Sequence, residues 1–262
     1  MAVVRFGGVD VFYTRVGQGP LVVLVHGAGI DGRMWRPQIE ALADEFTVVA
    51  WDEPGSGRSG DLPSGFGLAD FADALAVVIE DAGLGPAQVA GLSWGGTVVL
   101  ELYRRRPDLV RSLLMVDTYA GWKGSLPAEE VAARVEGARA MMAVPREEFD
   151  PALPGLYASG PPERFAALLD EMSREVRPET MAVQLSLMAD ADESDLLPRI
   201  TVPTLLLWGE LDARSPLSVA HAFRDAIPHS ELVVIPGVGH MSNLEAPETF
   251  TASVRAFCRT HA

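Results

Sequence analysis

The amino-acid sequence predicts an α/β protein with a mostly parallel sheet and helices on both of its faces. Short apolar runs alternate with helical stretches along the chain, which is the order of a doubly wound sheet. Residues 21–25 and 204–208 are almost continuously apolar, as parallel strands buried on both faces are. A glycine-rich turn at residues 91–96 joins a third apolar run directly to a helix.

The strands are predicted from apolar runs bounded by turn residues. Gly7 and Gly8 interrupt the extended segment 3–15, which indicates a hairpin at an antiparallel edge. The expected strands are residues 9–15, 21–26, 47–51, 88–91, 112–116, 204–208 and 231–235.

The helices of the main sheet are predicted from periodicity and from prolines. In residues 68–81, apolar side chains recur close to every 3.6 residues. The helix of residues 97–106 follows the glycine turn and is stopped by Pro107. The helices of residues 216–226 and 247–259 each begin with a proline near the first turn.

Residues 119–198 break this alternation, because they contain no strand signal. They are rich in Ala, Glu, Arg and Met, and prolines separate short helical pieces. We expect a helical cap inserted after the sixth strand, at the edge where such sheets bind ligands. The expected core domain is therefore residues 1–118 and 199–262, and the cap is residues 119–198.

Composition narrows the class of protein and its partners. The chain has 262 residues, of which 48% are hydrophobic, so it can build a packed core and is not wholly disordered. There are 21 Lys+Arg and 36 Asp+Glu, and the net charge of -15 makes nucleic acid and anionic membranes poor partners. The first residues lack a long apolar segment, so a soluble, cytoplasmic protein is expected.

Nothing in the sequence predicts a metal or a phosphate-binding loop. The single cysteine, Cys258, excludes an intrachain disulfide framework and a zinc site made of cysteines. No H-E-x-x-H motif and no His/Cys cluster is present. The glycine-rich turn of residues 52–59 lacks the lysine of a phosphate-binding loop, and we interpret it as scaffold.

The motif Gly91-Leu-Ser-Trp-Gly95 has the form of a nucleophile elbow. It lies between a predicted strand and a predicted helix, which is the context that this motif requires. Such a tight turn needs glycine at both ends and presents the hydroxyl of Ser93 outward. The alternative role for Ser93 is that of an ordinary helix N-cap.

A serine nucleophile needs a base, and a base needs a carboxylate. Of five histidines, His240 lies in a glycine-rich loop directly after the last strand, at the same sheet edge as Ser93. Asp212 follows the strand of residues 204–208, which gives the order Ser, Asp, His of acyl hydrolases built on α/β sheets. Glu210 and Asp117 are rival carboxylates at this edge.

An oxyanion must be held by backbone N–H groups. One donor is expected from Trp94, the residue after the nucleophile, and the other from the loop after residues 21–26. In that loop Ala28 is our first choice and Gly29 the second, while His26 is expected to shape the turn. The residues expected to line an apolar substrate pocket are Gly29, Trp35, Tyr119, Trp122, Met141, Met142, Tyr157 and Met241.

Taken together, these motifs resemble the α/β-hydrolase fold superfamily over nearly the whole chain. Residues 92–96 and 240–245 are similar to the 3-oxoadipate enol-lactonase-like esterases and lactonases, although Trp94 stands where those lactonases usually carry Met and is more like proline iminopeptidases. The resemblance implies eight strands, a variable cap and no cofactor. It also implies a triad of Ser93, Asp212 and His240, with Ala28 and Trp94 in the oxyanion roles.

The expected function is that of a serine hydrolase that cleaves a carboxylic ester or lactone of a small apolar substrate through an acyl-enzyme on Ser93. Three alternatives use the same triad: an aminopeptidase of the proline-iminopeptidase type, a C–C bond hydrolase and a cofactor-free haloperoxidase. A ligand receptor without turnover is an alternative of another class. The partner is expected to be a small molecule. The substrate, the arrangement of the cap and the oligomeric state, including a homodimer, stay open.

Overall fold

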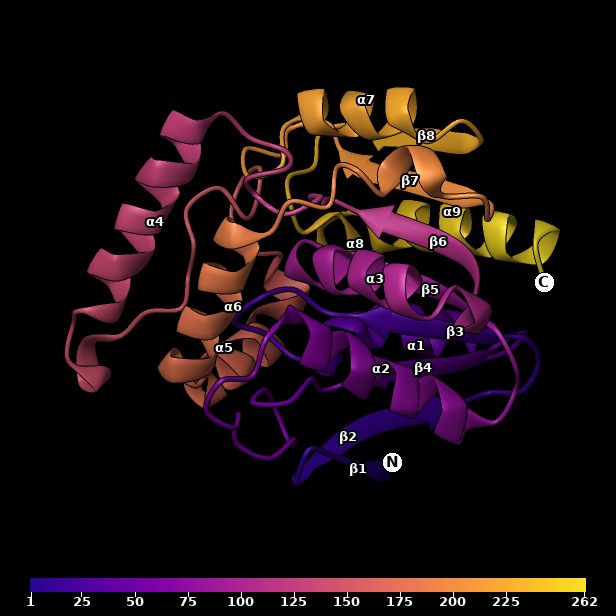
Figure 1. Ribbon diagram of the computed structural model, residues 1–262, viewed down its shortest axis with the longest axis horizontal. Helices are drawn as coiled ribbons and strands as arrows, with labels where there is room; N and C mark the ends of the chain where they lie inside the picture. Colours follow the sequence, from indigo (N-terminus) through magenta and orange to yellow (C-terminus); the bar gives the residue numbers. More distant parts are fainter.

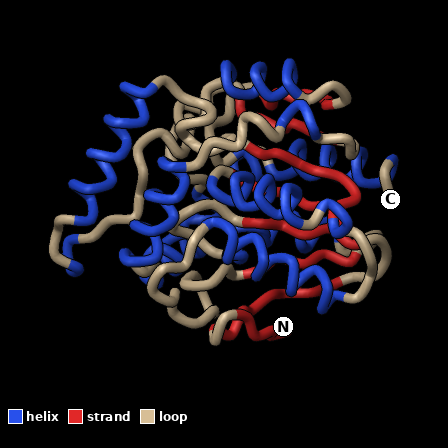
Figure 2. The backbone as a smooth tube through the Cα atoms, viewed as in Figure 1, coloured by secondary structure: helices blue, strands red, loops and turns tan.

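The computed structural model describes the backbone of residues 1–262 and the side chains of all of them except Arg146. One eight-stranded sheet runs through the molecule in the order β1-β2-β4-β3-β5-β6-β7-β8 (Figure 1, Figure 2). The strands are β1 (Ala2–Phe6), β2 (Val9–Val16), β3 (Leu21–Val25), β4 (Thr47–Trp51), β5 (Ala87–Leu92), β6 (Val110–Val116), β7 (Thr204–Gly209) and β8 (Ser230–Ile235). Strands β3 to β8 are parallel and β1–β2 is an antiparallel edge hairpin, which confirms the predicted fold class.

Helices cover both faces of this sheet, so each strand buries two sets of side chains. In β3, Val23 and Val25 face the core beneath α2, α3 and α7, whereas Val22 and Leu24 face the core beneath α1 and α9. The described helices are α1 (Arg36–Leu42), α2 (Leu68–Ala82), α3 (Trp94–Arg105), α4 (Ala128–Met142), α5 (Ala166–Glu175), α6 (Pro178–Asp190), α7 (Leu217–Ala226), α8 (Ser242–Glu245) and α9 (Pro247–Thr260). Short 3-10 helices are η1 (Gly32–Trp35), η2 (Pro107–Leu109), η3 (Arg146–Glu148), η4 (Glu163–Phe165) and η5 (Leu197–Arg199). Within the described chain, no helix has both the length and the apolar character needed to cross a bilayer.

Helix α2 shows how local sequence sets the ends of an element. At its start the N–H of Gly67 donates to the carboxylate of Asp70 at 2.8 Å, which satisfies one free backbone group. At its end Gly83 adopts a φ of 66°, a left-handed conformation that glycine reaches without strain. The helix therefore spans nearly the residues that its apolar period predicts.

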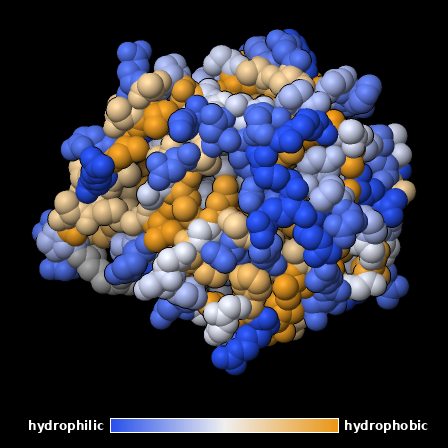
Figure 3. All heavy atoms as spheres, viewed as in Figure 1, coloured by the Kyte–Doolittle hydropathy of each residue, from blue (hydrophilic) through white to orange (hydrophobic). Residues whose placement is uncertain are grey.

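Residues 119–198 hold α4, α5 and α6 between β6 and β7. Helix α6 buries residues such as Met181 and Leu185, and α4 packs on its outer side, away from the sheet (Figure 1). Helix α4 has no buried residue of its own. Apolar side chains are visible on this side of the molecule, over α4 and α6 (Figure 3).

Candidate active site

The turn between β5 and α3 holds Ser93 in a strained conformation. Its φ is 54° and its ψ is -120°, a region that residues with side chains rarely occupy. Two hydrogen bonds hold the backbone in this conformation. The N–H of Ser93 donates to the carbonyl of Val116 at 3.0 Å, and its carbonyl accepts from the hydroxyl of Thr118. The side chain of Ser93 therefore projects from a fixed backbone.

Glycine is required on both sides of this serine. A Cβ atom on Gly91 would lie 2.6 Å from the carbonyl oxygen of Gly95, and one on Gly95 would lie 2.5 Å from the carbonyl oxygen of His26. Backbone atoms on both sides leave no room for either. The close approach of α3 to the strands β3 and β5 thus depends on these two residues.

His240 and Asp212 form a buried pair. The Nδ1 atom of His240 lies 2.8 Å from Oδ2 of Asp212, and both side chains are almost fully buried. The other carboxylate oxygen, Oδ1, accepts the N–H groups of Arg214 and Ser215 at 2.8 Å each. These bonds orient the carboxylate toward Nδ1, so the imidazole donates from Nδ1 and Nε2 is free to take a proton.

Ser93, Asp212 and His240 follow β5, β7 and β8, so they meet at the carboxyl edge of the sheet. Ser93 and His240 line the same cavity. No hydrogen bond joins the serine hydroxyl to the imidazole among the described residues.

The rival carboxylates are engaged elsewhere. Asp117 accepts the N–H of Gly209 at 2.7 Å and the hydroxyl of Ser242. Burial, together with the nearby charge of Asp212, raises the pKa of the Asp117 carboxyl well above its ordinary value. Glu210 is exposed and accepts the N–H of Gly237 at 2.9 Å. Of the three candidates, Asp212 is the one bonded to His240.

The backbone donors expected to hold an oxyanion differ in their availability. The N–H of Gly29 donates to Oε1 of Gln184 at 3.1 Å, so it is occupied. The N–H of Trp94, the first residue of α3, has no partner within that helix. In the described chain the N–H of Ala28 makes no hydrogen bond either. The structure thus leaves Ala28 and Trp94 as the free pair of donors.

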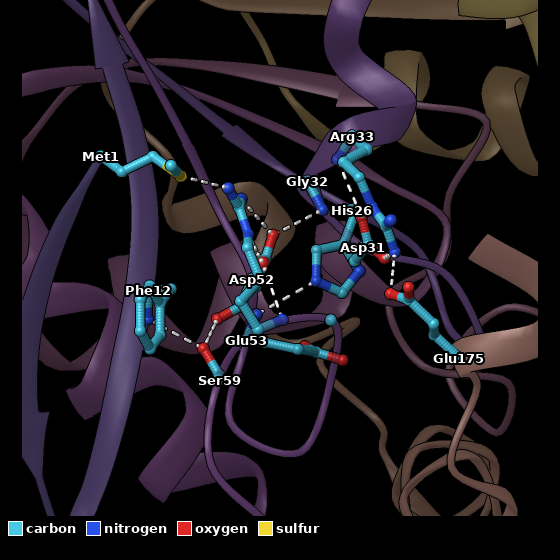
Figure 4. A network of polar contacts seen from close by, with 12 residues as sticks. Met1, Phe12, His26, Asp31, Gly32, Arg33, Asp52, Glu53, Ser59 and Glu175 are labelled. Atoms are coloured by element: carbon cyan, nitrogen blue, oxygen red, sulfur yellow. Dashed lines mark hydrogen bonds and ion pairs between the residues drawn. The ribbon is translucent and has the colours of Figure 1, made fainter. Parts of the chain in front are cut away.

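His26 shapes the loop that carries Ala28. Its Nδ1–H donates to the carbonyl of Gly27 at 2.8 Å. Its Nε2 accepts the N–H of Glu53 at 3.1 Å (Figure 4). Both ring nitrogens are bonded to backbone, so the ring links this loop to the turn after β4. Figure 4 also shows the Asp52 carboxylate turned toward the N–H of Gly32, which it accepts at 3.1 Å.

The cavity at Ser93 is small and mostly apolar, with a volume of about 50 Å³. It adjoins an apolar groove of about 300 Å³ that shares Ile30, Leu156 and Tyr157 with it. Arg214 is the one side chain with a permanent charge in the described lining. The lining residues are Gly27, Ala28, Gly29, Ile30, Leu92, Ser93, Pro151, Leu153, Leu156, Tyr157, Leu185, Met188, Arg214, His240 and Met241.

Three of the eight expected pocket residues, Gly29, Tyr157 and Met241, line this cavity. The other five lie outside the lining, although the ring of Tyr119 packs beside that of His240, with centroids 6.5 Å apart. Trp35 packs on Phe250 of α9, with ring centroids 5.9 Å apart. Tyr119 and Trp122 lie under the guanidinium of Arg134. Met141 and Met142, at the end of α4, pack against the main core.

The residues that sequence reasoning missed come mainly from the cap. Leu185 and Met188 are one turn apart on α6 and face the cavity together, a spacing visible in the sequence. Leu153 and Leu156 lie between prolines, where no periodicity indicates their direction. Arg214 is two residues beyond Asp212, and only the fold shows that it lines the cavity.

No cluster of three or more His, Cys, Asp or Glu side chains able to hold a metal occurs among the described residues. The candidate site is therefore built from Ser93, the buried Asp212–His240 pair, free backbone donors and an apolar cavity.

This sheet, with a serine on its strand-to-helix turn and an Asp–His pair at the same edge, defines a hydrolase of the α/β class. Residues 20–247 match the alpha/beta hydrolase fold family, and the chain belongs to that family. It is 30% identical over 258 residues to a pimeloyl-[acyl-carrier protein] methyl ester esterase of Chromobacterium violaceum, covering 97% of this chain and 100% of that one. It is 31% identical to a protein of Azorhizobium caulinodans described as a carbamate hydrolase, RutD, covering 96% of each chain.

Solved structures agree with this assignment. A thermophilic esterase from Thermogutta terrifontis superposes with a TM-score of 0.83 at 32% identity, covering 99% of this chain and 97% of that one. An enol-lactonase from Burkholderia xenovorans has a TM-score of 0.84 at 24% identity, covering 98% of this chain and 100% of that one, and shows that the fold is shared. The predicted membership of the α/β-hydrolase superfamily is confirmed.

Proposed function

We propose that the protein is a serine hydrolase that cleaves carboxylic esters or lactones of small, largely apolar substrates. One observation carries the proposal: Ser93 and the Asp212-bonded His240 open onto one apolar cavity at the carboxyl edge of the sheet. The named esterases among the relatives support an ester as the substrate class.

In the proposed reaction, Oγ of Ser93 attacks the substrate carbonyl carbon while Nε2 of His240 takes the hydroxyl proton. Asp212 stabilises the imidazolium that forms. The N–H groups of Ala28 and Trp94 donate to the oxyanion of the tetrahedral intermediate. The C–O bond to the alcohol then breaks, and the imidazolium gives its proton to the departing oxygen.

The second half of the reaction repeats these steps with water. His240 takes a proton from a water molecule, whose oxygen attacks the acyl carbon of the ester on Ser93. The intermediate collapses, Ser93 regains its proton from the imidazolium, and the acid leaves. For a lactone, the alcohol and the acid leave as one hydroxy acid.

The cavity disfavours the aminopeptidase alternative. A peptidase of that type needs a carboxylate to bind the substrate ammonium. The described lining contains no carboxylate, and Glu130 on α4 is already paired with Arg134. The lining instead carries Arg214, for which the described residues supply no ion pair.

The nucleophile is tested by labelling with a fluorophosphonate and locating the adduct by mass spectrometry. We expect the adduct on Ser93, and we expect Ser93→Ala to lower kcat by on the order of a million-fold with an unchanged melting temperature. Ser253→Ala, at a half-buried serine on α9, is the matched control and should label and turn over like the wild type. An adduct elsewhere, or turnover retained by Ser93→Ala, would contradict the mechanism.

The substrate class is tested by a panel of methyl esters, lactones and aminoacyl amides. Half-esters of dicarboxylic acids are paired with their neutral diesters, because Arg214 gives the cavity a positive charge. Faster hydrolysis of the amides than of the esters would overturn the proposed substrate class while leaving the nucleophile in place.

A further inference from the structure

Glu53, in the turn after β4, is a fully buried carboxylate that the proposed reaction does not use. One oxygen, Oε2, accepts the indole N–H of Trp94 at 2.9 Å, and the other, Oε1, accepts the side-chain amide of Gln184. The same Gln184 amide also donates to the Ser56 hydroxyl at 3.4 Å. Glu53 thus joins three segments that are far apart in the sequence: the turn after β4, the start of α3 and helix α6 of the cap.

These bonds reach both sides of the expected oxyanion hole. On one side, Trp94 is the residue whose own backbone N–H is free. On the other side, Oε1 of Gln184 accepts the N–H of Gly29, which is next to Ala28. Gln184 therefore links Glu53 to the loop that carries Ala28. The backbone N–H of Glu53 also donates to His26 (Figure 4). His26 in turn donates to the carbonyl of Gly27. One residue therefore contacts the supports of both free donors.

We propose that Glu53 is a positioning residue, which holds the backbone N–H groups of Ala28 and Trp94 in place through Gln184, His26 and the Trp94 ring. The proposal rests on the hydrolase function above, because it assigns a role in the same oxyanion hole. It also makes the cap part of the catalytic apparatus, since Gln184 belongs to α6.

Two opposing effects act on the protonation of Glu53. Trp94 and Gln184 present only N–H donors, so their hydrogen bonds are strongest to the ionised carboxylate, whereas burial favours the protonated acid. Burial raises the pKa of Glu53 to about 7. Below that pH the carboxyl is protonated, and the positioning bonds are weakened as pH falls.

The charged groups around Glu53 leave its carboxylate without a salt-bridge partner in the described structure. His26 is the titratable side chain that lies against it. The others are paired among themselves. These pairs are Asp52 with Arg58 at 2.7 Å, Asp31 with Arg33 at 2.6 Å, and Asp61 with Arg177 of α6 at 3.3 Å. Burial thus raises the pKa of Glu53, while the neighbouring His26 and the donors Trp94 and Gln184 act in the opposite direction.

The first test is Glu53→Gln, measured as kcat and KM for a methyl ester between pH 5 and 9. A glutamine at this position cannot accept from both Trp94 and Gln184, because one of its terminal atoms is itself an N–H donor. We expect kcat at pH 8 to fall at least about ten-fold with KM changed less than about two-fold. The inhibition constant of a trifluoromethyl ketone, which forms an oxyanion on the serine, should rise in parallel with the loss of kcat.

The pH profile separates positioning from a merely structural role. In the wild type, protonation of Glu53 should contribute to the fall of kcat toward acid. In Glu53→Gln this contribution should be absent, so the acid limb should differ from that of the wild type. Gln184→Leu removes a donor from the carboxylate, so it should shift the acid limb to higher pH. Gln88→Leu is the matched control, since Gln88 is equally buried but bonds to Ser112 and Cys258, and its acid limb should not move.

Unchanged kcat in Glu53→Gln, or an acid limb that is the same in wild type, Glu53→Gln and Gln184→Leu, would overturn the proposal. Melting temperatures identify a variant that fails to fold, in which case Gln184→Leu decides the matter by its pH shift. If Ser93 is labelled and esters are hydrolysed but the Glu53 variants behave like wild type, the positioning role fails and the function stands. If Ser93 is not labelled, the function itself fails.

Discussion

At the scale of single residues, the site depends on how closely two backbones approach. Ser93 can point into the cavity because Gly91 and Gly95 let α3 lie against β3 and β5. The sequence identifies these positions, since glycine spacing around a serine after a strand has few other uses. It also places Asp212 and His240, because each directly follows a parallel strand.

Gly95→Ala should therefore be among the most damaging single substitutions in the chain. Its Cβ would lie 2.5 Å from the carbonyl oxygen of His26 and 2.6 Å from that of Val25, both of them backbone atoms. We expect a loss of at least about 3 kcal/mol of unfolding free energy, measured by urea denaturation. Gly137→Ala on α4, where nothing lies within 4 Å, should instead stabilise by about 0.5–1 kcal/mol. Equal effects of the two substitutions would contradict this interpretation.

At the scale of elements, the strands were predictable and the direction of cap side chains was not. The apolar run of β7 and the period of α2 determine those elements locally. The sequence of α4 has no clear apolar face, so it does not indicate which way Met141 and Met142 point. Their expected place in the pocket failed because tertiary packing on α6, rather than local periodicity, sets the orientation.

Helix α4 should be the least protected long helix of the described chain. Its residues Ala128–Met142 include none that is buried, whereas α3 (Trp94–Arg105) buries nine. Local opening is easier where few apolar contacts hold an element. In hydrogen–deuterium exchange followed by mass spectrometry, we expect α4 amides to exchange at least about a hundred-fold faster than those of α3. Equal protection of the two helices would show that α4 is held by contacts other than burial.

At the scale of the whole molecule, buried carboxyls set how stability varies with pH. Glu53 is fully buried and has a raised pKa of about 7, and burial also raises the pKa of Glu193 well above its ordinary value. A group whose pKa is higher in the folded than in the unfolded state favours folding when protonated. Its contribution is present below its unfolded pKa and is lost as pH rises through the folded pKa.

Glu53 alone should cost the fold about 3 kcal/mol between pH 4.5 and pH 8, because its pKa moves from 4.5 to about 7. Urea unfolding of wild type and Glu53→Gln across this range tests the sign and the size. The wild type should lose free energy of unfolding relative to the variant as pH rises, with most of the change complete near pH 7. A constant difference between the two proteins would show that Glu53 does not titrate in this range.

The insertion of residues 119–198 leaves and re-enters the sheet at β6 and β7, which are neighbouring strands. Because these strands are parallel, the chain leaves at the carboxyl end of β6 and re-enters at the amino end of β7. The two ends of the helical insertion still meet, since the N–H of Glu193 donates to the carbonyl of Ala120 at 2.9 Å and the N–H of Trp122 donates to the carbonyl of Met188 at 2.7 Å. Because the insertion lies outside the strands, we expect that a different segment could replace it without changing the pairing of β6 and β7. The hydrogen bond from Gln184 to Glu53 adds a condition for such a replacement. The new segment must also supply an N–H donor to Glu53, or residue 53 must be replaced by a side chain that needs no such donor.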